Sequence, residues 1–198
     1  MNASRPVRRS GALLVVMVAM LVAGCSGSGA GQRGSAFVFL TVDQFSLSGA
    51  TPVALVISFL EDDGASTLVC VTLRNTLKNP TLTAPTALDN VVVQSYTVTF
   101  SGLGLGPFRF NATVLVPAGT ISGTPPAPSG NTARFPIILV PAEAKRQPPL
   151  RPFPQLPLTT TATILFKGRD GRGAGVDAEG SLTVVLRGDG TDTAASCG

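Results

Sequence analysis

The chain of 198 residues contains no histidine, so it lacks the residue that most often acts as a general base or a metal ligand. Its 15 lysines and arginines and 11 aspartates and glutamates form no concentrated basic cluster, which excludes nucleic-acid binding as the function. With 22 glycines, 16 prolines and many threonines and valines, the composition favours strands and turns over helices.

Residues 1–24 have the order of a cleaved secretory signal peptide. Arginines precede the uncharged, mostly apolar run 11–23, and small residues then lead directly to Cys25. The sequence LVAGC at 21–25 resembles the lipobox of bacterial lipoproteins, which implies that Cys25 is acylated and becomes the mature N-terminus. Two alternatives stay open. One is an ordinary secretory signal. The other is a transmembrane anchor, although a helix needs roughly 20 apolar residues to cross a bilayer and the run 11–23 is shorter.

Removal of the signal leaves twelve basic and eleven acidic residues, so the mature chain is nearly neutral. Residues 25–35 comprise the lipidated cysteine and a Gly/Ser-rich tether, which would hold the next domain close to its membrane. Ser26 replaces the aspartate that retains many lipoproteins in the inner membrane, so by analogy we expect an outer-membrane location in the bacterial envelope. The expected partners are the membrane, through the lipid on Cys25, and a protein of unknown identity.

Eight candidate strands follow in a predicted domain at 36–188, with a C-terminal tail at 189–198. Apolar and polar residues alternate in most of them, and no sustained helical period occurs after Cys25. We therefore predict an all-β fold, an antiparallel immunoglobulin-like β-sandwich of about eight strands. The candidate strands cover residues 37–42, 53–60, 67–74, 91–100, 108–116, 134–140, 160–167 and 181–187.

The alternation is cleanest over residues 108–116, where it predicts burial of Phe110 and Val114. Their neighbours Arg109 and Thr113 are predicted to be exposed. The last two candidate strands flank a Gly-rich turn and predict a hairpin. Other residues predicted to face inward are Tyr96, Val98, Phe100, Ala162, Ile164, Phe166, Leu182, Val184 and Leu186.

Two further strands carry specific expectations. Residues 53–60 place Val53, Leu55, Ile57 and Phe59 on one face, while the other face is also fairly apolar. Pro136 has no amide hydrogen for a sheet ladder, which places the strand 134–140 at a sheet edge or a bulge.

Two proline-rich segments do not fit strands. Residues 117–130 are predicted to form a loop. Residues 141–157 predict an extended, polyproline-like crossover that runs along the surface from one sheet to the other. A ligand for a partner domain is the alternative interpretation of such a stretch.

If Cys25 carries lipid, Cys70 and Cys197 remain, and thiols beyond the inner membrane tend to pair. We predict a disulfide between them that clips the tail onto the domain. Cys70 alternates with Thr72 and Arg74, so its sulfur is expected on the more polar side of the strand. Two free buried thiols, or pairing of Cys197 with another molecule, are the alternatives.

No catalytic or cofactor motif is present. The chain has no Gly-x-Ser-x-Gly elbow, P-loop or clustered cysteine ligands, and Lys78, Lys145 and Lys167 have no nearby serine motif. We therefore predict no catalytic residue, no cofactor and no metal site.

Two acidic segments are the places where chemistry would otherwise lie. Residues 61–64 (EDDG) lie between two apolar strands and predict a solvated turn. Residues 168–180 hold Asp170, Asp177 and Glu179, whose oxygens suit calcium, but their spacing is not that of known calcium loops. The simpler interpretation is a turn in which the two arginines of this segment pair with its aspartates.

Three short segments occur in an order that resembles a group of uncharacterised bacterial lipoproteins. They are residues 93–100 (VQSYTVTF), 140–150 (VPAEAKRQPPL) and 162–173 (ATILFKGRDGRG). The resemblance implies an immunoglobulin-like β-sandwich in which the third segment ends one strand and opens the hairpin to the last strand. It implies no catalytic residue.

We expect a non-catalytic binding or structural module at the envelope. One alternative is a barrel-like carrier of a small apolar ligand. The other is an enzyme that uses carboxylates from Asp62, Asp63, Asp170 or Asp177. The phenylalanines that would line a carrier cavity are Phe37, Phe39, Phe59, Phe100, Phe108, Phe110 and Phe166.

Overall fold

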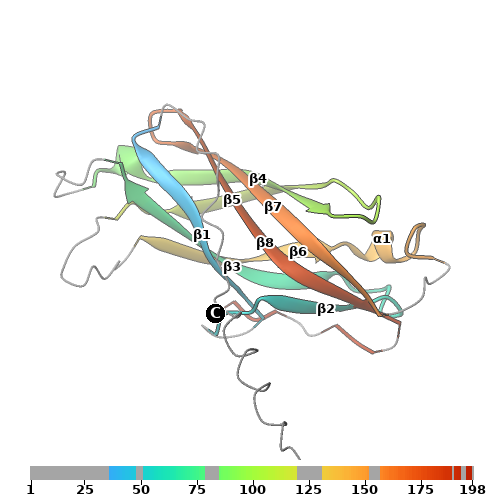
Figure 1. Ribbon diagram of the computed structural model, residues 1–198. Helices are drawn as coiled ribbons and strands as arrows, with labels where there is room; N and C mark the ends of the chain where they lie inside the picture. The colour runs from blue at the N-terminus through green and yellow to red at the C-terminus, as the bar shows by residue number, and fades with distance from the viewer. Residues whose placement is uncertain are drawn as a thin grey trace, which may run out of the picture.

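The computed structural model describes a β domain that begins at Ala36 (Figure 1). The predicted signal peptide, Cys25 and tether lie outside the described residues, as does most of the loop predicted at 117–130. The described ranges are 36–47, 51–78, 85–119, 131–151, 157–188, 190–192 and 195–197. The elements are β1 (Val38–Ser46), β2 (Leu55–Phe59), β3 (Thr67–Leu77), the 3₁₀ helix η1 (Ala87–Asp89), β4 (Val91–Phe100), β5 (Phe108–Val116), β6 (Thr132–Val140), α1 (Ala142–Lys145), β7 (Leu158–Asp170) and β8 (Gly175–Arg187).

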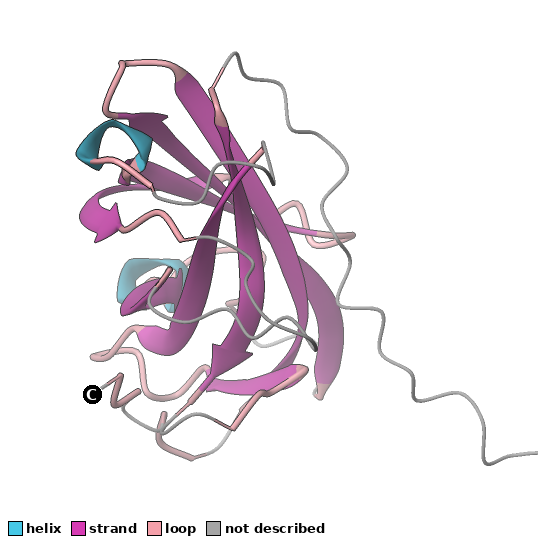
Figure 2. Ribbon diagram, turned by 90° about the vertical axis from the view of Figure 1, so that its left-hand side faces the viewer, coloured by secondary structure: helices cyan, strands magenta, loops and turns pink. Residues whose placement is uncertain are grey.

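The described strands form two sheets. One contains three strands in the order β1-β3-β6, and the other contains five in the order β2-β8-β7-β4-β5 (Figure 1). Neighbouring strands pair antiparallel, except that β2 runs parallel to β8. Little helix accompanies the strands (Figure 2). The all-β sandwich of about eight strands is confirmed, with one parallel pair that the alternation did not predict.

Inward-facing residues of both sheets build the core. In β4, Tyr96, Val98 and Phe100 are buried as predicted, and a register shift between Val93 and Ser95 keeps the first valines of the strand inward too. Phe135 of β6 lies edge-on to Phe166 of β7, with 6.2 Å between ring centroids, so the two sheets meet directly. The other residues predicted to face inward are also buried: Ala162, Ile164, Leu182, Val184 and Leu186.

The predicted hairpin of β7 and β8 is confirmed, and both strands are longer than expected. Gly180 lies where β1 passes over β8. A Cβ atom at this position would lie 2.9 Å from Val42 Cγ1 and 3.1 Å from Phe45 Cζ, so these side chains would have to shift to make room for it. Glycine therefore allows the close approach of β1 to β8 seen here.

β2 buries Val56 and Ser58, whereas Leu55 and Ile57 on the other face are 46% and 38% exposed. The face that groups Leu55 and Ile57 is thus the outer one. Because both faces of this strand are largely apolar, its period of two does not choose between them. The buried Ser58 hydroxyl instead has a specific partner, Thr67, at 2.7 Å.

The segment after β6 connects the two sheets as predicted, but its beginning is not extended. Residues Ala142–Lys145 form α1, and turns follow through Leu150. Ala144, Lys145 and Leu150 are buried, so this part of the crossover belongs to the packed interior. The polyproline prediction was wrong here because it weighed the prolines and not the helix-favouring sequence AEAK between them.

Two strands with specific predictions, β5 and β6, lie at sheet edges. β6, which contains Pro136, is an edge strand of the three-stranded sheet, as expected. β5 is an edge strand of the larger sheet. Arg109 and Thr113 are exposed as predicted, but Phe110 and Val114 are only half-buried. An edge strand has one hydrogen-bonded neighbour, so its inward residues are less completely covered.

This difference predicts a graded response to truncation. Phe166→Ala, at a fully buried position, should lower the free energy of unfolding by about 3–5 kcal/mol. Phe110→Ala should cost roughly half as much, since its ring mainly stacks on Tyr96 at 5.0 Å. Thr113→Ala should stay within about 0.5 kcal/mol. Urea titrations measure all three, and an equal loss for both phenylalanines would contradict the exposed edge.

Candidate functional site

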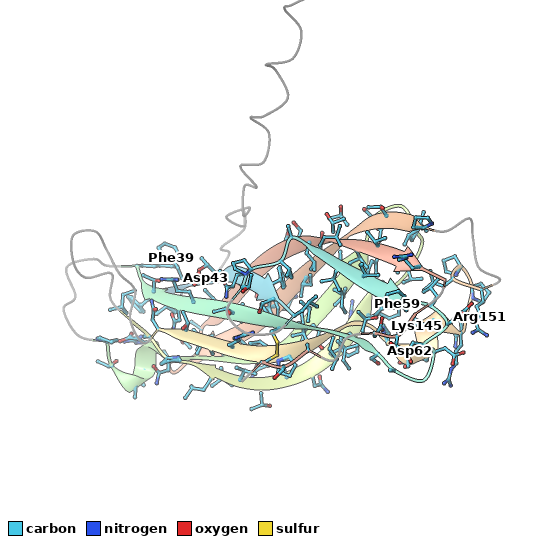
Figure 3. The ribbon with its side chains drawn as sticks, turned by 90° about the horizontal axis from the view of Figure 1, so that it is seen from below. Phe39, Asp43, Phe59, Asp62, Lys145 and Arg151 are labelled. Atoms are coloured by element: carbon cyan, nitrogen blue, oxygen red, sulfur yellow. A yellow bond between two sulfur atoms is a disulfide. The ribbon has the colours of Figure 1, made fainter. Side chains whose placement is uncertain are left out.

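The buried ammonium group of Lys145 lies at one end of the sandwich (Figure 3). We call this end the distal end; α1, residues 60–66 and residues 190–192 form it. Lys145 Nζ donates to the carbonyl oxygens of Asp62, at 3.0 Å, and Ala65, at 2.8 Å. It also forms an ion pair with the carboxylate of Asp192. All three ammonium protons therefore have oxygen partners, as a buried charge requires.

Asp192 connects this lysine to two strands. Its Oδ1 accepts the backbone N–H of Phe59, at 2.7 Å, and its Oδ2 accepts the Thr67 hydroxyl, at 2.6 Å. Its own N–H donates to the Asp62 carboxylate, at 2.9 Å. Since the Thr67 proton goes to Asp192, the Ser58 hydroxyl is the donor in its pair with Thr67. The cluster thus joins β2, β3, α1, the loop before β3 and the tail.

The cluster brings a serine, a threonine and a lysine together, which sequence reasoning missed. Lysine-assisted catalysis needs an amine that accepts the proton of the nucleophilic hydroxyl. Among the described residues, however, Lys145 donates to carbonyl and carboxylate oxygens, and the hydroxyls of Ser58 and Thr67 form a chain that ends on Asp192. This arrangement fastens segments together.

Removal of the ammonium should destabilise the domain strongly. Lys145→Met leaves the Asp192 carboxylate buried, at 4% side-chain exposure, without its counter-ion. Breaking a buried pair in this way costs about 3–5 kcal/mol. The matched control is Arg146→Met, because Arg146 is 56% exposed and lies 3.7 Å from Asp63; it should change stability by less than about 1 kcal/mol. Thermal or urea unfolding measures both variants, and similar losses of stability for the two would contradict the stabilising role of the Lys145–Asp192 ion pair.

The acidic segment 61–64 is a turn-containing connection, as predicted, but it joins β2 and β3 of different sheets. Its carboxylates are not simply solvated. Asp62 accepts the N–H of Asp192, and Asp63 pairs with Arg151 at 2.9 Å. The connection therefore serves as part of the distal end.

A second polar cluster, centred on Asp89, lies at the opposite end of the sandwich. We call this end the proximal end; Phe37, Lys78, η1 and the turn 171–174 form it. Asp89 of η1 accepts hydrogen bonds from the backbone N–H and the hydroxyl of Thr86, both at 2.8 Å, and from Arg172 at 2.7 Å. Burial of Asp89 raises its pKa, but the bonds from Thr86 and Arg172 outweigh burial and hold the pKa below its ordinary value of 3.8.

The predicted pairing of arginines with aspartates in the segment 168–180 was wrong. Arg172 pairs with Asp89, and Arg169 donates to the carbonyl oxygen of Gly173 at 2.9 Å. Asp170 Oδ1 instead accepts the backbone N–H groups of Arg172, at 3.0 Å, and Ala174, at 2.8 Å. Asp170 is thus a turn-forming aspartate, since such side chains commonly accept local backbone N–H groups.

The candidate carboxylates do not converge. Asp62 and Asp63 lie at the distal end, whereas Asp170 lies at the proximal end. Asp170 lies on the buried face of β7, whereas Asp177 and Glu179 occupy more exposed positions of β8. Among the residues that the structure describes, no three aspartate, glutamate, cysteine or histidine side chains group as metal ligands would.

The lowered pKa of Asp89 predicts acid sensitivity. A carboxyl group with a lowered folded-state pKa contributes stability above the unfolded pKa, and this contribution is lost as the pH falls through the folded value. Asp89→Asn should therefore be less stable than wild type at pH 6, and the difference should shrink below about pH 4. Urea unfolding across this range measures it. A difference that stays constant with pH would overturn this assignment.

The phenylalanines proposed for a carrier cavity separate into two groups. Phe100 and Phe166 are buried, and Phe108 and Phe110 pack against them or against Tyr96. In contrast, Phe37 and Phe39 are 60% and 37% exposed. The remaining one, Phe59, is half-buried next to Gly190. The seven rings therefore do not line one shared space.

Cys70 and Cys197 form the predicted disulfide. Cys70 lies on the face of β3 that carries Thr72 and Arg74, as predicted, but its sulfur is not accessible, because this residue is fully buried. The tail itself provides cover: Cys197 is bonded to Cys70, and the N–H of Ser196 donates to the carbonyl oxygen of Leu47 at 3.1 Å. The disulfide therefore fixes the tail over the outer side of β3.

Comparisons of the chain with protein-family models, with curated proteins and with solved structures find no match. In the described part of the chain, no helix has the length and apolar character needed to cross a bilayer.

Proposed function

We propose that this protein is a bacterial lipoprotein, anchored through Cys25, that displays a non-catalytic β-sandwich as a binding or structural module at the cell envelope. The observation that carries the proposal is the LVAGC sequence at 21–25, followed after ten residues by a domain that begins at Ala36. A cleaved signal that ends directly before a cysteine suits lipid attachment. The disulfide supports an oxidising compartment beyond the inner membrane.

The resemblance to uncharacterised lipoproteins supports the same proposal. Its first segment, 93–100, lies within β4, and its third, 162–173, ends β7 and enters the turn to β8. These positions agree with the order that the resemblance implies.

The absence of a catalytic role is supported by the use of the polar side chains. At the distal end, Lys145 donates to two carbonyl oxygens and pairs with the Asp192 carboxylate, while Ser58 donates to the Thr67 hydroxyl, which donates to the same carboxylate. The candidate acids are divided between opposite ends, whereas acid–base catalysis needs groups that reach one substrate. Display of a surface to a protein partner requires no such convergence.

Acylation of Cys25 is directly testable. Wild-type protein should incorporate labelled palmitate in bacterial cells, and Cys25→Ser should abolish the label and accumulate the uncleaved precursor. Ser28→Ala, which leaves Cys25 and Ser26 in place, is the control for a substitution near the cleavage site, and it should be labelled and processed like wild type. Processing and membrane retention of Cys25→Ser like wild type would refute the anchor. Density-gradient fractions of wild-type envelopes test the outer-membrane location.

A further inference from the structure

Exposed apolar side chains gather around the proximal end of the sandwich. Five of the seven large apolar residues that are exposed in the described part of the chain lie there. The other two, Leu55 and Ile57, lie on β2. Clustered apolar exposure on a monomer commonly marks a contact surface. The five proximal residues are Phe37, Phe39, Leu88, Val92 and Leu115.

Backbone pairing places these residues at one end, although they come from different strands and sheets. The N–H of Lys78 donates to the carbonyl oxygen of Phe37, at 2.9 Å, where β3 ends beside the start of β1. In the other sheet, Val92 pairs in register with Leu115. Leu88 belongs to η1, directly before β4. Phe37 and Leu88 therefore lie at the tip, with the other three residues around it.

Arg172 connects Phe37, before β1, with Leu88 of η1 at this tip. Its guanidinium carbon lies 4.9 Å from the centre of the Phe37 ring, and its Nη1 lies 3.3 Å from the carbonyl oxygen of Leu88. Lys78 Nζ similarly lies 5.2 Å from the centre of the Phe39 ring. Each exposed ring thus has a cation beside it, a combination that suits the boundary between headgroups and acyl chains.

Of the acidic groups in this half of the sandwich, the two nearest the tip are withdrawn from its surface, whereas Asp177 and Glu179 occupy more exposed positions further along β8. Asp89 and Asp170 are 4% and 5% exposed, and each accepts hydrogen bonds from nearby backbone. Arg169 and Arg172, by contrast, are exposed. Around Phe37 and Leu88 the exposed charged side chains are therefore those of Arg169 and Arg172, the latter also paired with Asp89, and this basic character complements the anionic lipids of bacterial membranes.

We propose that the proximal end is a membrane-contact surface, in which Phe37 and Leu88 insert at the lipid boundary and the neighbouring cations face the headgroups. This inference rests on the proposed anchor at Cys25. Only ten residues separate Cys25 from Ala36, and a chain of this length spans at most roughly 40 Å. The first described strand begins at the apolar tip itself, so an anchored domain would present this end to the bilayer.

The absence of tryptophan from the chain allows a direct test, because each introduced tryptophan is the single one. Lipidated Phe37→Trp, Leu88→Trp and Ile57→Trp proteins would be reconstituted in phosphatidylethanolamine–phosphatidylglycerol vesicles, with and without brominated acyl chains. Ile57 is the matched control, because it is exposed on β2 and apolar but remote from the tip.

We expect brominated lipid to quench tryptophan at 37 and 88 strongly and to shift their emission to the blue, with little effect at 57. No quenching at any position would overturn the proposal and favour a protein partner for the tip. Equal quenching at all three would overturn it as well, because the domain would then lie flat on the membrane.

A second preparation separates this inference from the anchor itself. In chain 25–198, Cys25 provides the single free thiol, since Cys70 and Cys197 are bonded to each other, and it can be coupled to a maleimide lipid. The same quenching pattern in this preparation supports the contact surface even if cells do not acylate Cys25. Acylation in cells without quenching in either preparation would refute the surface and leave the lipoprotein proposal intact.

Discussion

The buried ammonium of Lys145 imposes the strongest constraint on this fold. Its three protons require oxygen partners, and these come from the loop before β3 and from the tail. The carboxylate of Asp192 then requires donors of its own, which β2 and β3 supply through the Phe59 N–H and the Thr67 hydroxyl. One buried charge thereby determines how two sheets, a helix and the C-terminal tail meet.

The two ends of the sandwich consequently differ in character. At the distal end, charge is buried and bonded, and the polar groups hold neighbouring segments together. At the proximal end, carboxylates are buried but aromatic and basic side chains remain on the surface. In the proposed lipoprotein the proximal end is the one near the anchor, and five of the seven exposed large apolar residues of the described chain lie there.

Much of the fold could be predicted because its central strands alternate cleanly. The bounds of β4 and β5 and the inward residues of β7 and β8 follow from a period of two. The buried face of β2 could not be predicted in this way, because both faces of the strand are largely apolar. The Lys145 cluster could not be predicted, because Ser58, Lys145 and Asp192 are far apart in sequence and meet only through tertiary contacts. The disulfide was accessible to prediction because compartment and cysteine number left one intramolecular pairing.

The tail is held by two chemically different bonds that are five residues apart, the ion pair of Asp192 and the disulfide of Cys197. Each bond shortens the stretch of chain that the other must order, so their contributions to stability are coupled rather than independent. With the disulfide intact, a tail released from Lys145 stays close to its binding site and can rebind quickly. With the disulfide reduced, the ion pair alone must offset the entropy lost when the segment after β8 is ordered. Covalent closure therefore makes a costly buried charge tolerable in a segment outside the strands, where local opening would otherwise expose it.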